Sequence, residues 1–168
     1  MNKTYYIIIA IVLVLIVAIS LTLTNQNSDT DINITDVVYT DLDITFKPSE
    51  GSNIVTENFF TDQSVKADTL NPGLYELGNT ITIDPVTGKL PLYVAIFDKQ
   101  SGVFNISLLQ QPFSRSRIEA EVYLKNLLQI SEEELCKLSY SVTVPEYVSR
   151  DASGFDYRFS FCPGSIPL

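Results

Sequence analysis

The chain has 168 residues, enough for one domain of ordinary size with an appendage, and 45% of them are hydrophobic. Its 20 acidic residues outnumber its 11 basic ones, which disfavours binding to nucleic acid, because phosphate recognition needs clustered Lys and Arg. It has no histidine, and this excludes His-activated Ser and Cys nucleophiles, His-centred general bases and the usual zinc sites.

Residues 1–24 predict a membrane anchor. Residues 5–23 contain no charge and no proline, and as a helix they would span about 28 Å, close to the hydrocarbon thickness of a bilayer. Lys3 precedes this run and acidic residues follow it, so the positive-inside rule predicts one pass through the cell membrane with a cytoplasmic N-terminus. A cleaved signal peptide is the alternative, with Ala18 and Ser20 at a small-residue processing site. Both outcomes export the remainder of the chain.

Residues 25–35 are polar and lack hydrophobic periodicity, which indicates a tether. Residues 36–168 then have the patterning of a single globular domain, which we expect to be extracytoplasmic. The chain contains neither a Walker loop nor a G-x-G-x-x-G motif, so the sequence predicts no cofactor.

The first strand of this domain is predicted at residues 37–46, VVYTDLDITF. Asp41 and Asp43 lie two residues apart on one face of that strand. Paired carboxylates suit a histidine-free hydrolase, although a solvated strand face is the simpler interpretation. The opposite face of the strand at residues 37–46 carries the apolar residues Val38, Leu42, Ile44 and Phe46.

A weaker strand is expected at residues 53–60.

The central part of the chain predicts three consecutive strands, at residues 79–84, 89–98 and 103–110. Short turns bearing Pro or Gly separate them, as is typical of an antiparallel meander. The pattern then changes to a helical period over residues 116–130. The apolar stripe of this helix consists of Ala120, Tyr123, Leu124, Leu127 and Leu128.

Two helix starts have the S-x-x-E spacing of a capping box, Ser116 with Glu119 and Ser131 with Glu134. The second box begins a short helix predicted at residues 132–138. Together these elements predict an α+β fold, in which a helical pair lies on one face of an antiparallel sheet.

Two further strands are expected, at residues 140–144 and 155–161. The second is an alternating aromatic run that ends at Cys162, whereas Cys136 lies in the short helix. Two thiols in an exported domain normally pair, so a disulfide is favoured over two free buried thiols, and two cysteines without histidine make a poor metal site. Cys162 alternates out of phase with the aromatic side chains, so a twist or bulge must redirect it if those side chains face the helices.

The loop DASGFD contains a weak set of calcium candidates, Asp151, Ser153 and Asp156. These residues place oxygen atoms on a glycine-bearing loop, which hard cations prefer, but without the spacing of an EF-hand. A plain turn is the simpler interpretation. The sequence predicts no other metal site and no catalytic residue.

Residues 123–145 and 160–168 resemble the closing module of uncharacterised single-pass exported proteins of small-genome candidate-phyla bacteria. The shared pattern is a helix, an I-S-E-E start to a second helix with its Cys, a V-x-V-P strand and a C-P-G-S ending. The resemblance is limited to this C-terminal module. It implies export, anchoring and the pairing of Cys136 with Cys162, and it carries no activity.

These features favour a non-enzymatic, membrane-tethered domain that binds or scaffolds an extracytoplasmic protein or a surface polymer. A pilin-like or secretion-apparatus subunit is the alternative, since an apolar N-terminal helix can pack with copies of itself. The anchor lacks the processing glycine and the early acid that such subunits typically show. A histidine-free hydrolase that uses Asp or Glu is a third possibility.

Overall fold

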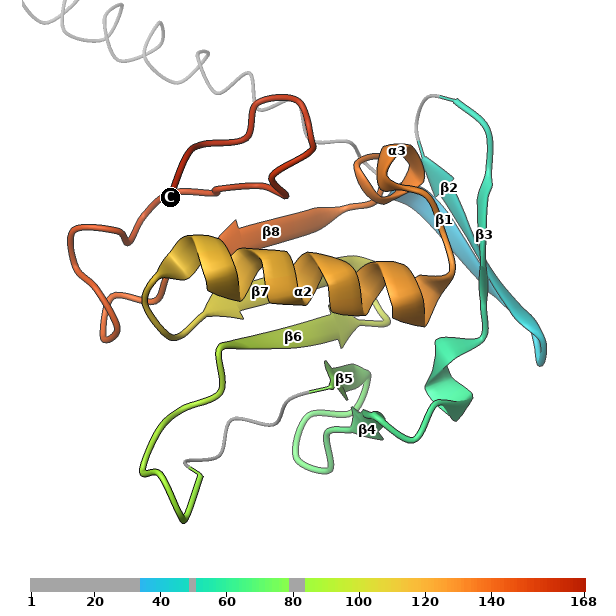
Figure 1. Ribbon diagram of the computed structural model, residues 1–168. Helices are drawn as coiled ribbons and strands as arrows, with labels where there is room; N and C mark the ends of the chain where they lie inside the picture. Colours follow the sequence, from blue (N-terminus) through green and yellow to red (C-terminus); the bar gives the residue numbers. More distant parts are fainter. Residues whose placement is uncertain (1–33, 49–50, 79–83) are drawn as a thin grey trace, which may run out of the picture. The chain divides into compact units, whose positions relative to one another are not determined.

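The computed structural model describes residues 34–48, 51–78 and 84–168. A three-stranded antiparallel sheet consists of β1 (Ile34–Tyr39), β2 (Asp43–Pro48) and β3 (Ile54–Glu57), in that order. A 3-10 turn, η1 (Phe59–Thr61), leads into a five-stranded sheet, whose strands β4 to β8 neighbour one another in chain order (Figure 1). These strands are β4 (Val65–Ala67), β5 (Leu74–Leu77), β6 (Tyr93–Asp98), β7 (Val103–Leu108) and β8 (Tyr140–Thr143).

Two helices, α2 (Phe113–Leu128) and α3 (Glu132–Leu135), connect β7 to β8. This crossover makes β8 parallel to β7, with Phe104 opposite Tyr140, whereas the strands from β4 to β7 are antiparallel. The predicted α+β class is therefore confirmed. The prediction of one antiparallel sheet is wrong, because the described residues form an antiparallel sheet and a mixed one.

The segment predicted as one strand at residues 37–46 is a hairpin, formed by β1 and β2. Thr40 closes the turn, because its hydroxyl donates to the carbonyl of Asp43 at 2.8 Å and accepts from the Asp43 N–H at 2.8 Å. The side chain of Asn58 donates to the carbonyls of Thr40 and Asp41, at 3.1 and 3.2 Å. The alternating pattern continued across this turn, so it gave no sign of the break.

The turn also separates the four apolar side chains that were expected on one face. Ile44 and Phe46 on β2 are fully buried, whereas Val38 and Leu42 are 39% and 80% exposed. The strand expected at residues 53–60 is confirmed in its first half as β3, which pairs with β2. Asn58 then caps η1 by accepting from the N–H of Phe60.

The central meander is confirmed between β6 and β7, which pair from Tyr93 opposite Leu108 to Asp98 opposite Val103. Residues 79–83 of the first predicted strand lie outside the described residues, and Asp84 lies at a turn. The neighbour of β6 is instead β5, which the sequence pattern did not indicate.

The hydrophobic core lies on one face of the five-stranded sheet. Tyr93, Ala95 and Phe97 alternate along β6 toward that face, and their partners on β7 are also buried. Phe97 and Phe104 meet Phe46 of the three-stranded sheet, with ring centroids 6.1 and 5.8 Å away. The aromatic side chains of both sheets therefore share one core, and α2 covers the remainder of the face (Figure 1).

The apolar stripe predicted for the long helix is confirmed, since Ala120, Leu124 and Leu128 are fully buried. The predicted start is wrong, because α2 begins three residues earlier, with Pro112 at its N-cap. Ser116 lies inside the helix and is fully buried, and its hydroxyl donates to the carbonyl of Gln110 at 2.7 Å. Ser116 therefore satisfies a backbone carbonyl of the segment that leads into α2, and it does not cap the N-terminus of the helix.

The short helix is confirmed with its capping box, in which Ser131 and Glu134 bond each other's backbone N–H groups. It is shorter than residues 132–138, because α3 ends at Leu135 and isolated turns follow. The predicted anchor at residues 5–23 lies outside the described residues. In the ranges given above, no helix has both the length and the apolar character needed to cross a bilayer.

Candidate functional site

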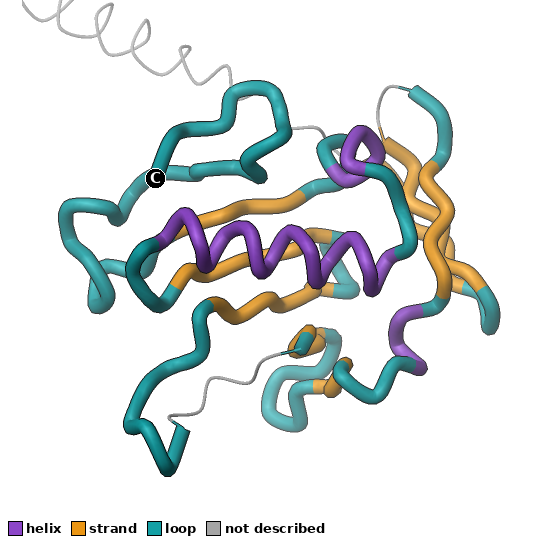
Figure 2. Tube along the Cα trace, in the orientation of Figure 1, coloured by secondary structure: helices purple, strands orange, loops and turns teal. Residues whose placement is uncertain are grey.

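The C-terminal segment, residues 145–168, runs beside α2 and α3 without forming a strand (Figure 2). The strand expected at residues 155–161 is therefore wrong. Arg158 has a φ of 55°, in the left-handed region, which interrupts an extended chain. Tyr157 and Phe159 are nevertheless buried, whereas Phe155 is 52% exposed and Phe161 is half-buried, so the alternation predicted burial only in the middle of the run.

The middle of this segment covers the outer edge of β8. The N–H of Val142 donates to Oδ1 of Asp156 at 2.9 Å, and the Val142 carbonyl accepts from the N–H of Tyr157 at 2.8 Å. The same carboxylate oxygen accepts from the N–H of Arg158 at 3.1 Å. Asp156 thus substitutes for a neighbouring strand, which protects an edge that would otherwise expose unpaired backbone groups.

A buried ion pair on α2 holds the rest of the segment. Arg117 and Glu121 are 7% and 5% exposed, and Arg117 Nε lies 3.8 Å from Glu121 Oε1. Arg117 Nη1 donates to the carbonyl of Ile166 at 2.9 Å, and Glu121 accepts from the N–H and the hydroxyl of Ser160. Two buried charges on one helix therefore satisfy backbone groups on both sides of the turn at Cys162.

Sequence reasoning missed this pair. Arg117 and Glu121 are one helical turn apart, and they fall on the same stripe as Ala120, Leu124 and Leu128. The available signal was an oppositely charged pair one turn apart within an apolar helical stripe. Such a pair indicates a buried ion pair, because charged side chains are rarely buried unless they are paired.

Cys136 directly follows α3, and Cys162 is buried in the C-terminal segment. Their sulfur atoms are 1.95 Å apart and their Cα atoms 5.5 Å apart, so the predicted pairing is confirmed. A turn redirects Cys162, because its N–H donates to the carbonyl of Phe159 at 3.0 Å. This turn resolves the conflict between the direction of the aromatic side chains and that of the thiol.

A hollow of about 560 Å³ lies between α3 and the C-terminal segment, and we call it the α3 hollow. Its volume is within the range of small-molecule sites. A second hollow of about 410 Å³ lies at the start of α2, and its lining consists of Leu168 and four residues around the helix start. The lining of the α3 hollow is Glu132, Glu133, Cys136, Lys137, Arg158, Phe161 and Pro163.

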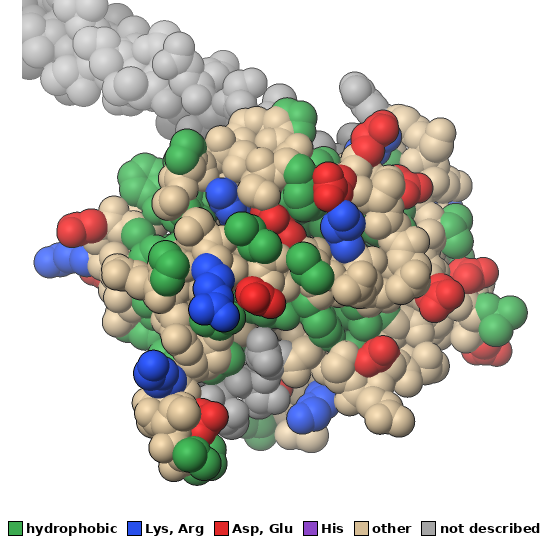
Figure 3. Space-filling model, in the orientation of Figure 1, with side chains coloured by type: hydrophobic (Ala, Val, Ile, Leu, Met, Phe, Trp, Pro, Cys, Tyr) green, Lys and Arg blue, Asp and Glu red, His purple; other side chains and the backbone are tan. Residues whose placement is uncertain are grey.

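Both acids of the α3 hollow are in ion pairs. Glu132 Oε1 lies 2.6 Å from Lys125 Nζ, and Glu133 Oε1 lies 2.7 Å from Lys137 Nζ. These pairs are exposed and add little stability. On the opposite wall, Arg158 Nη1 donates to the carbonyl of Pro163 at 3.2 Å. Acidic and basic side chains lie side by side over this face of the molecule (Figure 3).

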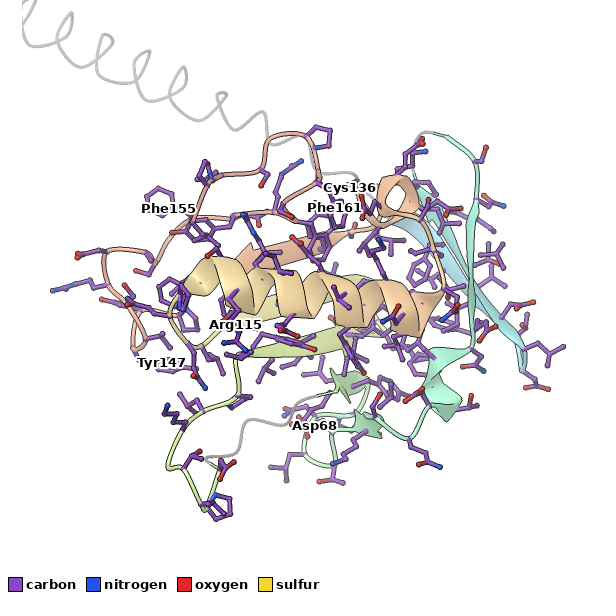
Figure 4. The ribbon with its side chains drawn as sticks, viewed as in Figure 1. Asp68, Arg115, Cys136, Tyr147, Phe155 and Phe161 are labelled. Atoms are coloured by element: carbon purple, nitrogen blue, oxygen red, sulfur yellow. A yellow bond between two sulfur atoms is a disulfide. The ribbon has the colours of Figure 1, made fainter. Side chains whose placement is uncertain are left out.

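Phe161 ends a column of aromatic rings. Its ring stacks on Phe159 at a centroid distance of 5.8 Å and an angle of 19°, and Phe159 stacks on Tyr140 at 4.2 Å. Phe159 is fully buried, so it gives the half-buried Phe161 a fixed support. Phe161 lies beside Cys136 (Figure 4), which places an apolar ring and a covalent cross-link in the same hollow.

The structure does not bring the predicted carboxylate pair onto one strand face. Asp41 lies in the turn between β1 and β2, whereas Asp43 begins β2. The interpretation of these residues as a pair of hydrolase carboxylates on one strand is therefore wrong in its geometry.

The calcium candidates have separate environments. Asp156 is committed to the backbone of β8, the hydroxyl of Ser153 donates to the carbonyl of Arg150, and Asp151 is exposed. Across the part of the chain that the structure describes, no group of three or more acidic or Cys side chains is placed to hold a metal ion.

The α3 hollow thus combines carboxylates, a guanidinium, an ammonium and an aromatic ring on a cross-linked frame. Such a set can donate and accept hydrogen bonds around an apolar ring, which is the chemistry of reversible binding. Comparison of the chain with protein-family models, curated proteins and solved structures finds no match.

Proposed function

We propose that this chain is a membrane-tethered extracytoplasmic domain that binds another surface component and catalyses no reaction. The apolar run at residues 5–23 supports the tether, and the α3 hollow supports the binding role. The observation that carries the proposal is the fixation of the hollow. Cys136 and Cys162 join its two walls, and the pair Arg117–Glu121 fixes the segment that forms one of them.

A fixed hollow favours binding because little conformational entropy is lost when a ligand enters it. The carboxylates of the hollow are paired with lysines and lie beside an apolar ring, an arrangement that suits hydrogen bonding to a ligand. Phe161 supplies the apolar contact that fixes a ligand's position.

Site-specific photocrosslinking on intact cells tests the binding role. The full chain carries p-benzoylphenylalanine in place of Phe161, and a matched control carries it in place of Phe155. Phe155 is 52% exposed and lies on the same segment, away from the hollow (Figure 4). We expect a crosslinked foreign component at position 161 that is absent at position 155. A ladder of self-crosslinked chains would favour the pilin-like alternative, and equal products at both positions would contradict the proposal.

Protease and thiol labelling on intact cells test the placement of the domain. We expect added protease to digest residues 36–168, and a maleimide reagent to label Cys136 and Cys162 only after reduction. Export would place both residues in an oxidising compartment, where such pairs persist. A protected domain with two labelled thiols would contradict export.

A further inference from the structure

We propose that the ligand of the α3 hollow is a neutral sugar unit of a surface polysaccharide, stacked on the ring of Phe161. This inference rests on the proposed binding function and names the chemical class of its ligand. It follows from the volume of the hollow, from the support of its aromatic ring and from the balance of its charges.

The ring of Phe161 gives the hollow an apolar platform. A pyranose ring has one face of C–H groups, which packs on the face of an aromatic ring through dispersion and apolar burial. Phe159 holds this platform from behind, at 5.8 Å and within 19° of parallel, and is itself fully buried. The ring is therefore fixed before the ligand arrives, which lowers the entropy cost of binding, and Lys125 Nζ, 6.0 Å from its centroid, adds a hydrogen-bond donor beside it.

The polar groups around the platform match the hydroxyls of a sugar. Each hydroxyl both donates and accepts, so a sugar needs acceptors and donors at short spacing. Glu132 and Glu133 supply acceptors on the α3 wall, and each ion pair engages only Oε1. Lys137 on the same wall and Arg158 on the opposite wall supply donors.

The charges of the hollow favour a neutral ligand. Its lining has two carboxylates and two cationic side chains, so no single sign dominates. An anionic polymer would meet Glu132 and Glu133 at the rim, on a chain with a net charge of −9. Nucleic acid and anionic lipid headgroups are disfavoured for the same reason. A volume of about 560 Å³ admits a short stretch of a polysaccharide.

The chain has no tryptophan, so a single substitution creates a specific reporter. In Phe161→Trp the new indole keeps the platform, and in the control Phe155→Trp it lies outside the hollow. Both full-length variants are placed in lipid nanodiscs, because glycosidic detergents would themselves present sugars to the site. The probes are cellotetraose, tetra-N-acetylchitotetraose and mannotetraose, with tetragalacturonate as the anionic comparison.

We expect at least one neutral tetrasaccharide to change the emission of Phe161→Trp saturably at millimolar concentrations, and to leave Phe155→Trp unchanged. By calorimetry on the full chain, Phe161→Ala should weaken that binding about tenfold, whereas Phe155→Ala should not. A silent Phe161→Trp, an equal response of both reporters or a preference for tetragalacturonate would overturn the inference.

The photocrosslinking experiment separates this inference from the function on which it rests. If position 161 captures a protein while all neutral tetrasaccharides are silent, the hollow binds a protein and the sugar inference is wrong. If position 161 captures nothing beyond the control and the sugars are silent, both proposals are wrong.

Discussion

The three-stranded sheet and the C-terminal segment satisfy their backbone groups in different ways. In the sheet, β2 pairs with a neighbouring strand on each side, and Thr45, for example, lies opposite Val38 of β1 and Val55 of β3. Each backbone hydrogen bond of the sheet is therefore one of a regular series. In the C-terminal segment, which forms no strand, local turns satisfy some backbone groups and single side chains satisfy others, among them Asp156 and the pair Arg117–Glu121. Stability is therefore spread over the sheet, but it depends on a few side chains in the segment that forms the hollow.

The largest expected effect is the loss of the buried carboxylate. Glu121→Ala leaves Arg117 buried without its counter-charge and removes the acceptor for Ser160, so we expect the free energy of unfolding to fall by about 4 kcal/mol. Urea unfolding of the full chain measures the change. Glu119→Ala, on the exposed side of the same helix, is the control and should change stability by less than about 0.5 kcal/mol. Equal losses in the two variants would contradict a special role for the pair.

The disulfide is expected to rank second. Cys136 and Cys162 are 26 residues apart, and the loop-entropy relation gives about 3.5 kcal/mol for closing that loop. Comparing the urea unfolding of the native chain with that of Cys136→Ser/Cys162→Ser measures this contribution. The double variant should also lose binding at the α3 hollow more than it loses helix content, because the cross-link joins the two walls. Unchanged stability would show that the segment is held by its other contacts.

Asp156 is expected to contribute about 2 kcal/mol, because Asp156→Ala removes the acceptor of the buried Val142 N–H. Asp156→Asn keeps an oxygen at that position and should recover more than half of the loss. Asp151→Ala, on the same loop, should leave the unfolding midpoint unchanged. If Asp151→Ala were as costly as Asp156→Ala, or if calcium raised the midpoint in the native chain but not in Asp156→Ala, the structural role assigned to Asp156 would be wrong.

Sequence patterns predicted the parts of this molecule that depend on local interactions. The stripe of α2, the capping box of Ser131 and Glu134 and the hairpin of β6 and β7 each involve neighbouring residues or a repeated period. The C-terminal strand was wrong because its partners are distant in sequence: Glu121 accepts from a residue 39 positions away. A period of two indicates which side chains can share a face, and it does not report where their backbone groups bond.

The candidate site was less predictable than the fold. The pairing of the cysteines was expected from their number and the inferred compartment, but the α3 hollow arises only when Arg158 and Phe161 are brought beside α3. No local pattern encodes that juxtaposition, since it depends on the left-handed residue Arg158 and the turn at Cys162. The break between β1 and β2 was missed for a different reason, because the alternating pattern runs unbroken through the turn that Thr40 closes.

A smaller loss of stability is expected when the capping box of α3 is removed, and the pH dependence of that loss identifies the interaction responsible. Hydrogen bonds from the Ser131 hydroxyl and N–H lower the pKa of Glu134 from its usual 4.5. A carboxylate with a lowered folded-state pKa stabilises the fold above pH 4.5, and that contribution is lost as the pH falls through the folded-state value. Ser131→Ala should therefore cost about 1 kcal/mol near pH 7 and progressively less below pH 4.5. A cost independent of pH would point to packing instead.

The smallest effect is expected in the three-stranded sheet. Val55 on β3 is 55% exposed and lies opposite Thr45, so Val55→Ala removes a partly solvated side chain and leaves the ladder intact. We expect a loss of about 0.5 kcal/mol in urea unfolding, since cross-strand side-chain pairs of this kind contribute little individually. If Val55→Ala were as costly as Asp156→Ala, exposed positions of the sheet would be as critical as those of the C-terminal segment. The distinction between distributed and concentrated stabilisation would then be wrong.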